Sequence, residues 1–422
     1  MSEMSYLEKL LDGVEVEWKT LGEVAKYVRG LIYSKSSESA DGQGYKVLRA
    51  NNITLSNNCL NLNDVKVVRF DTKVKSSQKL YKNDILISAA SGSREHVGKV
   101  AYIESDIDYY FGGFMGVVRC DEKLNPRYLF HVLTSDIFQK YLDEMLNSST
   151  INNLNSAVMG RFKIPLPCPD NPEKSLAIQS EIVRILDKFT ALTAELTAEL
   201  TMRKKQYNYY RDQLLSFDEG EVEWRTLGEI GEVRMCKRIL KSQTSSEGEI
   251  PFYKIGTFGK EPDSYISRKL FNEFKEKYSY PKVGEVLISA SGTIGRTVIF
   301  DGRESYFQDS NIVWIENNEK IVLNKYLFYF YKIAKWGISE GGTIKRLYND
   351  NLRKLMIPVP FPDSPERSLV EQQKIVKLLD KFDALTNSIT EGLPREIELR
   401  QKQYEYYRDL LFSFPKPDSV TN

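Results

Sequence analysis

The sequence predicts an α+β protein with two similar α/β domains in a pseudo-twofold arrangement, joined by two long helices that form an antiparallel coiled coil. Two observations predict this fold class. Motifs of the first half of the 422-residue chain recur in the second half, and an apolar stripe with helical spacing follows each set of strand-like segments. Recurrence at a fixed offset is the signature of a duplicated unit. Two such stripes in one chain bury each other most economically as a coiled coil.

Paired motifs carry the duplication. EVEWKTLGE at 15–23 matches EVEWRTLGE at 221–229, and DILISAASGS matches EVLISASGT. LNPRYLF matches LNKYLF, and FKIPLPCPDNPEKSL matches LMIPVPFPDSPERSL. IVRILDKFTALT matches IVKLLDKFDALT, and KQYNYYRDQLLSF matches KQYEYYRDLLFSF. Residues 30–150 and 235–340 barely resemble each other, so one scaffold is expected to present two different surfaces.

The order of elements is the same in each half. Short apolar runs such as DILISAA, FMGVVRC and NIVWI predict strands of a small twisted sheet. Helices are expected after them at 126–146 and 324–336. The prolines of IPLPCPDNP and IPVPFPDSP predict extended straps, because proline fixes φ and has no N–H to donate. The expected divisions are domains at 1–165, with an N-terminal helix stub, and 219–358, long helices at 166–218 and 359–414, and a tail at 415–422.

Each long helix is predicted from apolar residues three or four positions apart, from Ile178 to Phe217 and from Ile375 to Phe414. Gly392 and Pro394 interrupt the second stripe, so a helix break is expected near 391–394. The repeated TAEL at 193–200 adds two steps of about 6 Å of helix each. Because such a step nearly preserves the stripe, TAEL is interpreted either as a spacer or as a plain helix-forming repeat.

Composition narrows the class of protein. The start of the chain lacks the apolar core of a signal peptide, and no segment is apolar enough to span a bilayer, so a cytoplasmic location is expected. The four cysteines are far apart and only two histidines exist, so neither disulfides nor a metal site are expected. Lys and Arg outnumber Asp and Glu by 22 to 17 in residues 222–360, but only by 18 to 17 in residues 15–160. A basic footprint is therefore expected mainly in the second half.

Over essentially the whole chain, these motifs resemble the specificity subunit of type I restriction-modification systems. The resemblance is carried by the paired openings, the straps, LDKF at 186–189 and 379–382, the KQYxYYRD helix ends and the tandem TAEL, which is similar to the spacer repeat of one branch. It implies two target-recognition domains, each reading one half of a bipartite site in double-stranded DNA, with the spacer repeat governing the gap. It also implies docking of two methyltransferase subunits and, in the full complex, of translocase/nuclease subunits. S-adenosylmethionine, ATP and Mg are then expected on those partners and no cofactor on this chain.

No motif predicts catalysis by the chain itself. NPRY at 125–128 lacks the second proline of an adenine methyltransferase loop, and GSREHVGKV departs from Walker spacing. His96 and His131 have no nucleophile partner in the sequence. The chain is therefore expected to be a non-catalytic recognition subunit associated with the nucleoid. The alternative is a non-enzymatic two-domain scaffold that binds protein or glycan ligands at a fixed spacing.

Candidate contact residues lie in the variable loops and at the helix ends. Side chains suited to phosphates or base edges are Arg29, Tyr33, Lys35, Arg94, Asn152, Asn153, Arg234, Lys237, Arg238, Ser291, Thr293, Arg296, Thr343, Lys345 and Arg346. Tight turns, helix caps and solvated surface charge are the alternative explanations for them. Candidates for partner docking are Tyr207, Tyr210, Arg211, Tyr404, Tyr407 and Arg408, because Tyr and Arg favour interfaces. The alternative for these is packing at the base of the neighbouring domain.

Overall fold

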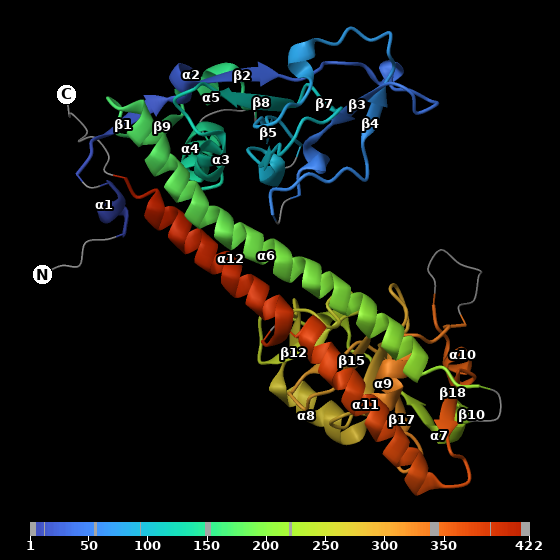
Figure 1. Cartoon of the computed structure of the whole chain (residues 1–422). Helices are drawn as coiled ribbons and strands as arrows, with labels where there is room; N and C mark the ends of the chain where they lie inside the picture. The colour runs from blue at the N-terminus through green and yellow to red at the C-terminus, as the bar shows by residue number, and fades with distance from the viewer. Residues whose placement is uncertain are drawn as a thin grey trace, which may run out of the picture. The chain divides into compact units, whose positions relative to one another are not determined.

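The computed structural model describes residues 6–11, 13–54, 57–92, 94–147, 153–218, 222–337, 346–388 and 390–414. The chain forms two compact units (Figure 1). Unit 1 comprises Met1–Leu196 and Ile397–Asn422, and unit 2 comprises Thr197–Glu396. Each unit therefore holds one of the two predicted domains together with parts of both long helices, rather than ending where the helices begin.

Unit 1 starts with a short helix, followed by a mixed set of strands and helices. Its helices are α1 (Tyr6–Leu11), α2 (Leu21–Val24), α3 (Pro126–Leu133), α4 (Asp136–Asn147) and α5 (Ser156–Arg161). Its strands are β1 (Val16–Thr20), β2 (Ala25–Arg29), β3 (Tyr45–Leu48), β4 (Lys66–Val68), β5 (Ile85–Ser88), β6 (Val100–Tyr102), β7 (Tyr110–Phe111), β8 (Met115–Cys120) and β9 (Lys163–Pro167). Its 3₁₀ helices are η1 (Lys35–Ser37), η2 (Ala50–Asn52), η3 (Ser76–Gln78) and η4 (Arg94–His96).

Unit 2 repeats the order of the strands. It adds a helix, α8, that the sequence patterns did not predict, and the described residues show no counterpart of α4 between α9 and α10. Its helices are α7 (Leu227–Ile230), α8 (Arg268–Lys277), α9 (Asn324–Tyr331) and α10 (Asn349–Arg353). Its strands are β10 (Val222–Thr226), β11 (Gly231–Arg234), β12 (Ile250–Tyr253), β13 (Tyr265–Ile266), β14 (Val286–Ser289), β15 (Thr297–Ile299), β16 (Tyr306–Phe307), β17 (Ile312–Asn317) and β18 (Met356–Pro360), with the 3₁₀ helix η5 (Lys241–Gln243). The long helices are α6 (Pro172–Leu214), α11 (Pro365–Asn387) and α12 (Gly392–Leu411).

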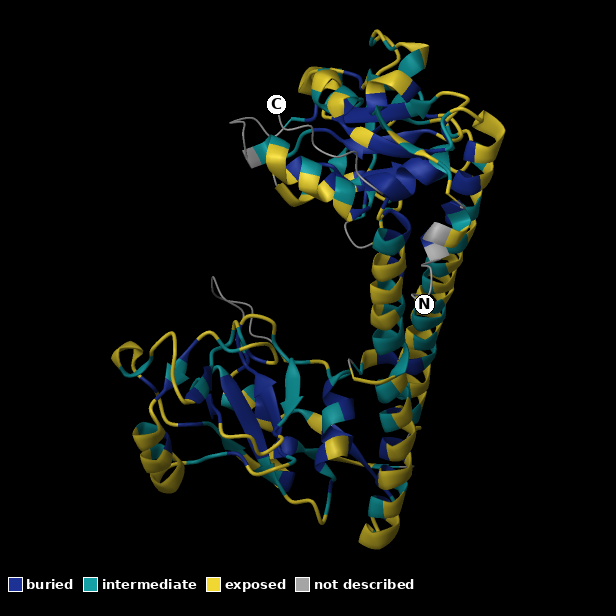
Figure 2. Cartoon of the chain, turned by 90° about the vertical axis from the view of Figure 1, so that its left-hand side faces the viewer, coloured by how far each residue is buried: buried dark blue, intermediate teal, exposed yellow. Residues whose placement is uncertain are grey.

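Sheet topology is the same in the two units. Unit 1 has a four-stranded sheet β2-β8-β5-β6, a three-stranded sheet β4-β3-β7 and the pair β1-β9. Unit 2 has β11-β17-β14-β15, β13-β12-β16 and the pair β10-β18. The central sheet of each unit is buried, whereas much of the loop surface is exposed (Figure 2). The duplication seen in the sequence is therefore a duplication of fold, and it includes the regions where the sequences have diverged.

The proline straps are the strands β9 and β18. Trp18 of β1 is opposite Pro165, and Trp224 of β10 is opposite Pro358. The carbonyl oxygen of Pro165 accepts a hydrogen bond of 2.8 Å from the Tyr128 hydroxyl. In unit 2 the Tyr326 hydroxyl donates to Pro358 in the same way, at 3.0 Å. Each strap is therefore fixed on one side by a strand and on the other by a buried tyrosine.

The predicted helices differ from the observed ones in detail. The helix expected at 126–146 is two helices, because α3 ends at Leu133 and α4 starts at Asp136. At Thr134, the hydroxyl donates to the carbonyl of His131, which caps the end of α3. The helix expected at 324–336 ends at Tyr331. Between α11 and α12 the chain leaves the helical path after Asn387, and Gly392 has φ of +79°, a value that favours glycine.

The long helices pack in opposite directions. In unit 1, Phe189 of α6 stacks on Tyr407 of α12, with ring centroids 5.3 Å apart. In unit 2, Tyr210 of α6 stacks on Phe382 of α11, with ring centroids 5.5 Å apart. The predicted antiparallel pairing is therefore present, with aromatic contacts as part of it.

The apolar side chains of the long helices are buried at some positions and exposed at others. Ile178, Ile182 and Leu186 are buried in the core of unit 1. Leu192, which the stripe also included, is 36% exposed, and so is Leu385 of α11. The stripe prediction was therefore wrong at these positions. The helical period places a residue on a face, but only the neighbouring elements decide whether that face is covered.

A partly buried polar cluster, here called the helix anchor, fastens α6 and α12 to α3 in unit 1. It consists of Arg127, His131, Asp187 and Tyr404. Asp187 accepts from Nε2 of His131 at 2.8 Å and from Nε of Arg127 at 2.9 Å. Since a carboxylate only accepts, Nε2 carries the proton, and Nδ1 of the neutral ring accepts from the Tyr404 hydroxyl at 3.0 Å. His131 therefore contributes to structure and is closed to solvent.

Unit 2 has an equivalent helix anchor with different side chains. Asp380 of the second LDKF motif accepts from the Tyr329 hydroxyl at 2.6 Å and pairs with Lys325 at 2.7 Å. Lys332 pairs with Asp383 at 3.1 Å and donates to the Tyr207 hydroxyl at 3.3 Å. The aspartate of LDKF is thus an anchor in both units, while its partners are histidine and arginine in one and tyrosine and lysine in the other.

Acidification is expected to destabilise unit 1 through His131. Burial lowers the pKa of His131 from its ordinary 6.5, and the hydrogen bond to Asp187 offsets only part of that shift. As pH falls through 6.5, the unfolded chain takes up a proton that the folded chain does not, so stability is lost down to the folded pKa. His131→Gln should therefore show a smaller fall in urea-unfolding midpoint than wild type between about pH 7 and about pH 5.5. His96→Gln, at the remaining histidine, is the control, and an unchanged pH dependence in His131→Gln would contradict the prediction.

Candidate functional site

The fold brings two distant loops together in each unit. In unit 1, the loop after β5 meets the segment before α5. Ala90 pairs with Asn153 in an isolated bridge, and the Leu154 amide donates to the Ala89 carbonyl at 2.7 Å. In unit 2, Ser291 pairs with Arg346, and the Leu347 amide donates to the Ala290 carbonyl at 2.8 Å. Candidates from separate stretches of sequence therefore lie next to each other, at the same place in both units.

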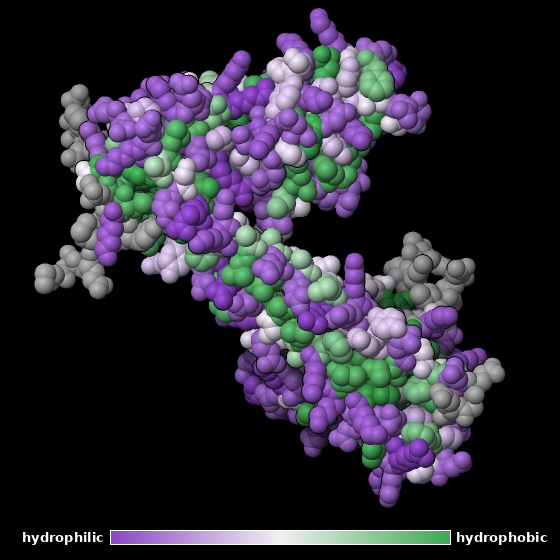
Figure 3. All heavy atoms as spheres, viewed as in Figure 1, coloured by the Kyte–Doolittle hydropathy of each residue, from purple (hydrophilic) through white to green (hydrophobic). Residues whose placement is uncertain are grey.

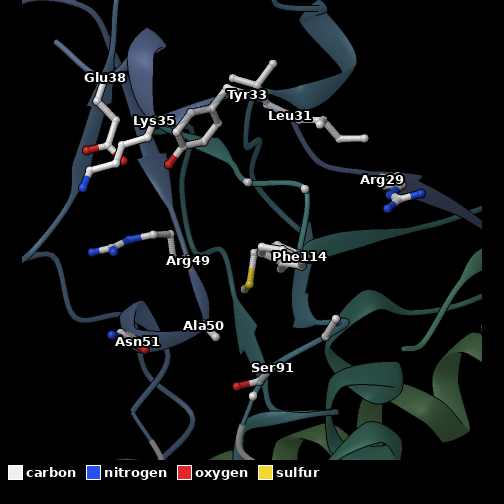
Figure 4. Close-up of a pocket in the computed structure, with 16 residues that line it drawn as sticks. Arg29, Leu31, Tyr33, Lys35, Glu38, Arg49, Ala50, Asn51, Ser91 and Phe114 are labelled. Atoms are coloured by element: carbon white, nitrogen blue, oxygen red, sulfur yellow. The ribbon is translucent and has the colours of Figure 1, made fainter. Parts of the chain in front are cut away.

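In unit 1 the loop after β5 borders a hollow of about 710 Å³, here called the unit 1 hollow. It is lined by Arg29, Leu31, Ile32, Tyr33, Lys35, Glu38, Arg49, Ala50, Asn51, Ala90, Ser91, Gly92, Gly112, Gly113, Phe114 and Met115. Figure 4 shows Arg29 on one side of Phe114, and Tyr33, Lys35 and Arg49 on the other. The sequence-predicted residues Arg29, Tyr33 and Lys35 are therefore brought together.

The charged groups of the unit 1 hollow differ in their availability. Glu38 is paired with Lys66 at 2.9 Å, and Arg49 is paired with Asp64 at 2.9 Å. Arg29 and Lys35 are exposed, and among the described residues neither has an ion-pair partner. Their positive charge is therefore free to meet an anionic ligand such as a phosphate.

Tyr33 contributes a neutral hydroxyl to the unit 1 hollow. Burial raises the pKa of Tyr33, and the carboxylate of Glu38 raises it further. Arg49 and Lys66 act in the opposite direction and are outweighed. The hydroxyl therefore keeps its proton and can both donate and accept a hydrogen bond.

The remaining candidates of unit 1 are at the edge of this surface. Arg94 forms an ion pair of 2.8 Å with Asp143 of α4, and more than half of its side chain is exposed. Asn153 is half-buried beside Ala90. Asn152 lies outside the described residues.

In unit 2 several candidates are already held by neighbouring groups. Arg234 pairs with Glu232 at 2.7 Å and with Glu316 at 2.8 Å, so it stabilises the pairing of β11 with β17. Arg296 donates to the Phe258 carbonyl at 3.0 Å. Lys237 lies 5.1 Å from the ring centroid of Tyr278, a cation–π contact.

The other unit 2 candidates are more varied. Arg238 and Thr293 are exposed, while Ser291 is buried and donates to Oδ1 of Asn311 at 2.8 Å. Arg346 donates to the Ser310 carbonyl at 3.3 Å. Thr343 and Lys345 lie outside the described residues. Of the predicted basic residues in the described part of unit 2, Arg238 is therefore the best placed to contact a ligand.

Residue patterns missed several members of this surface. Ile32 and Phe114 are 72% and 73% exposed in the unit 1 hollow, and neither was among the predicted contact residues. The signal available was the GGFMG run, because flanking glycines are typical of a turn rather than of a buried strand. Arg49 and Asn51 gave no signal, since they enter the hollow only through the pairing of β3 with β7.

Three of the helix-end candidates are buried and hydrogen-bonded within their own units. Tyr207, Tyr404 and Arg408 are 5%, 7% and 8% exposed. Arg408 donates to the Thr134 carbonyl at 2.6 Å, and the two tyrosines belong to the helix anchors. For these three residues the burial favours the alternative explanation, packing against a domain, because they tie the helix ends to the domains.

The docking prediction now rests on the outer residues. Tyr210 and Tyr407 are 44% and 42% exposed. Arg211 forms an ion pair of 2.8 Å with Asp212 and lies over the ring of Tyr207.

A second kind of hollow, here called the tryptophan groove, occurs once in each unit beside the proline strap. In unit 1 it measures about 670 Å³ and includes Trp18, Phe162, Phe412 and Phe414, with Lys140 and Asp409 among its charged groups. In unit 2 it measures about 810 Å³ and includes Trp224, Leu355, Leu215 and Phe217. Apolar atoms gather on the surface where α12 ends (Figure 3). Repeated motifs supply the tryptophan, the strap side and the helix-end side of each groove, whereas residues 136–144 and 330–337 of the divergent regions line the rest. The tryptophan and its neighbours in the motifs are therefore the part of the groove that the two units have in common.

Within the described part of the chain, no group of His, Cys, Asp and Glu side chains could hold a metal ion. Among the described helices, none is long and apolar enough to cross a bilayer.

A family model described as the type I restriction modification DNA specificity domain matches residues 13–202 and 219–399. The chain is 50% identical over 424 residues to a Haemophilus influenzae protein described as a type I restriction enzyme specificity subunit, covering 97% of this chain and 98% of that one. It is 40% identical over 443 residues to the EcoR124I/EcoR124II specificity subunit of Escherichia coli, with 100% of both chains covered.

Two solved structures share the fold. The S subunit of a type I restriction-modification system from M. genitalium has 17% identity and a TM-score of 0.51, covering 98% of this chain and 100% of that one. A chain from a structural study of type I restriction-modification complex assembly and conformational transition has 16% identity and a TM-score of 0.55, covering 94% and 97%. At these identities the likeness concerns the fold alone.

Proposed function

This chain belongs to the type I restriction-modification DNA specificity family, and we propose that each of its units reads one half of a bipartite target in double-stranded DNA. As a DNA specificity subunit it supplies recognition rather than catalysis. In unit 1 the reading surface is the unit 1 hollow with Arg29, Tyr33, Lys35 and Asn153. In unit 2 it is the matching surface around Arg238, Ser291 and Arg346.

The observation that carries this proposal is the combination of one topology with two different loop surfaces. The strand orders of the two units are the same, and the loop bridges Ala90 to Asn153 and Ser291 to Arg346 are at matching positions. The side chains presented there are different. Sequence is read at base edges, while contacts to phosphate only position a protein. A pair of units with the same frame and different side chains therefore suits a target with two unlike halves.

We assign the shared surface to shared partners. A protein that binds twice to this chain needs a surface that both units possess, and the tryptophan grooves meet that requirement. The partners are two methyltransferase subunits, which bring S-adenosylmethionine. Translocase/nuclease subunits with ATP and Mg join them in the full complex, in the cytoplasm.

Exchange of one variable region should change one half-site only. Replacing residues 30–150 by those of another family member replaces the loops of unit 1 and leaves unit 2 unaltered. Mapping methylated adenines in cells that carry the exchanged chain should show one new half-site and one original half-site. The reciprocal control replaces residues 235–340 and should change the other half. Two altered half-sites after a single exchange would refute the assignment of one half to each unit.

Trp224→Ala should reduce the number of methyltransferase subunits bound per chain from two to one. Trp224 is 47% exposed in its groove, and buried tryptophans at interfaces contribute about 2 kcal/mol or more when truncated. Native mass spectrometry of the assembled complex measures the stoichiometry, and the unfolding midpoint checks that unit 2 remains folded. Tyr209→Ala, at a ring that is 61% exposed on α6, is the control. Loss of a subunit in Tyr210→Ala with Trp224→Ala unaffected would instead favour the helix end.

Deletion of residues 197–200 should shorten the gap between the half-sites and leave both half-sites unchanged. These residues belong to α6, which contributes to both units. The deletion removes about 6 Å of helix, compared with about 3.4 Å per base pair of DNA, so a change of one or two base pairs is expected. Methylation mapping measures it. An unchanged gap with intact half-sites would show that TAEL is only a helix-forming repeat.

A further inference from the structure

The unit 1 hollow combines free positive charge with exposed apolar side chains. Ile32 and Phe114 are 72% and 73% exposed, and they share the hollow with Arg29 and Lys35. Apolar side chains of this size are normally buried, and an exposed group of them beside polar residues marks a binding surface. The cations identify the ligand as anionic, and the apolar pair must then contact an apolar part of that same ligand.

The backbone holds Phe114 in this exposed position. The amides of Ala89 and Ala90 donate to the Phe114 carbonyl at 2.9 and 3.0 Å, and the Met115 amide donates to Gly112 at 2.8 Å. Beneath the loop, a Cβ added at Gly30 would lie 2.0 Å from the Gly112 oxygen, so the two backbones are in close contact. The loop therefore has no space below it into which the side chain could turn.

Unit 2 has polar side chains in the two corresponding segments. The Ala290 amide donates to the Asn311 carbonyl at 2.7 Å, as that of Ala89 does to Phe114, so Asn311 matches Phe114. Arg238 lies in the segment between β11 and η5, and Ile32 lies in the corresponding segment between β2 and η1. Arg238 is exposed and, among the described residues, has no ion-pair partner. The corresponding segments thus present hydrocarbon in unit 1 and hydrogen-bonding groups in unit 2, where Oδ1 of Asn311 also accepts from Ser291.

We infer that unit 1 recognises thymine by contact of Ile32 and Phe114 with the 5-methyl group, whereas unit 2 reads its half-site by hydrogen bonds from Arg238 and Asn311. The inference rests on the proposed function, that each unit reads one half-site. In the major groove, thymine is the base that presents an apolar group, while arginine suits guanine and asparagine suits adenine. Arg29 and Lys35 hold the phosphates on either side and bring the base edges to the hollow.

Uracil substitution tests this inference directly. After the half-sites are mapped, the full chain in complex with its methyltransferase partner is titrated with three duplexes. One contains thymine, one has deoxyuridine in place of thymine in the unit 1 half-site, and one has it in the unit 2 half-site. Loss of each contacted methyl should weaken binding about four-fold, the ratio that corresponds to burial of one methylene-sized group. Uracil in the unit 2 half-site should leave affinity unchanged.

The variants Phe114→Asn and Ile32→Ala are titrated with the same three duplexes. Both should weaken binding to the thymine duplex and lose part of the discrimination between thymine and uracil. Phe70→Asn is the control. Phe70 is 64% exposed and does not line the hollow, and its ring centroid lies 5.2 Å from that of Tyr45. Since Phe114 is mostly exposed, the unfolding midpoint should not change.

Two results overturn the inference. One is equal affinity for the thymine and uracil duplexes with weaker binding by Phe114→Asn, which would make Phe114 a wedge between bases. The other is an affinity for the unit 1 half-site that does not change, in wild type or in the variants, when its thymines are replaced by deoxyuridine. Failure of the proposed function looks different, because wild type would then bind duplexes with and without the mapped half-sites equally. Arg29→Ala with Lys35→Ala should weaken binding to all duplexes alike. Lys26→Ala with Lys123→Ala should not, because Lys26 is near the start of β2 and Lys123 is in the turn after β8.

Discussion

The fastening of each long helix to its domain is the interaction on which the rest of the structure depends. In both units a half-buried aspartate of the LDKF motif accepts hydrogen bonds from the helix that follows the central sheet. Removing one partner from such a cluster leaves a buried charge or acceptor unsatisfied, which costs more than the bond itself contributes. The aspartate is kept in both copies, while its donors differ. The geometry of the acceptor therefore matters more than the identity of the donor.

The loops of each unit are joined by backbone hydrogen bonds, so the side chains of these loops can differ between the units. Carbonyl and amide groups make the contacts that join the loops, such as those of Phe114 with Ala89 and of Asn311 with Ala290. Backbone groups are present whatever the side chain, so the hydrogen bond between the two loops is kept whether phenylalanine or asparagine stands there. This is the physical reason why two regions of barely similar sequence have the same topology. It also suits a protein in which the frame is retained while the surface is altered.

Some of the residues that the two units share are buried and stabilise the fold, whereas others are exposed and available to partners. The inner tyrosines of the helix ends are in the helix anchors, and the outer ones remain exposed. The tryptophans of the paired openings lie in grooves beside the straps. A motif that is repeated in a duplicated chain can therefore be repeated for stability, as with Tyr207 and Tyr404, or because its exposed side serves both units, as with the tryptophan grooves.

The sequence by itself determined the duplication, the proline straps, the antiparallel helices and the interruption before Gly392, because each depends on local chemistry or on period. Proline cannot donate, glycine accepts positive φ, and spacings of three and four residues define a helical face. Only the tertiary structure decided which faces are covered, as with the exposed Leu192 and the buried Arg408. It alone brought Arg49 to Arg29 and Lys35, and turned Ile32 and Phe114 outward. Burial and proximity arise from contacts between segments far apart in the chain, and no local pattern contains that information.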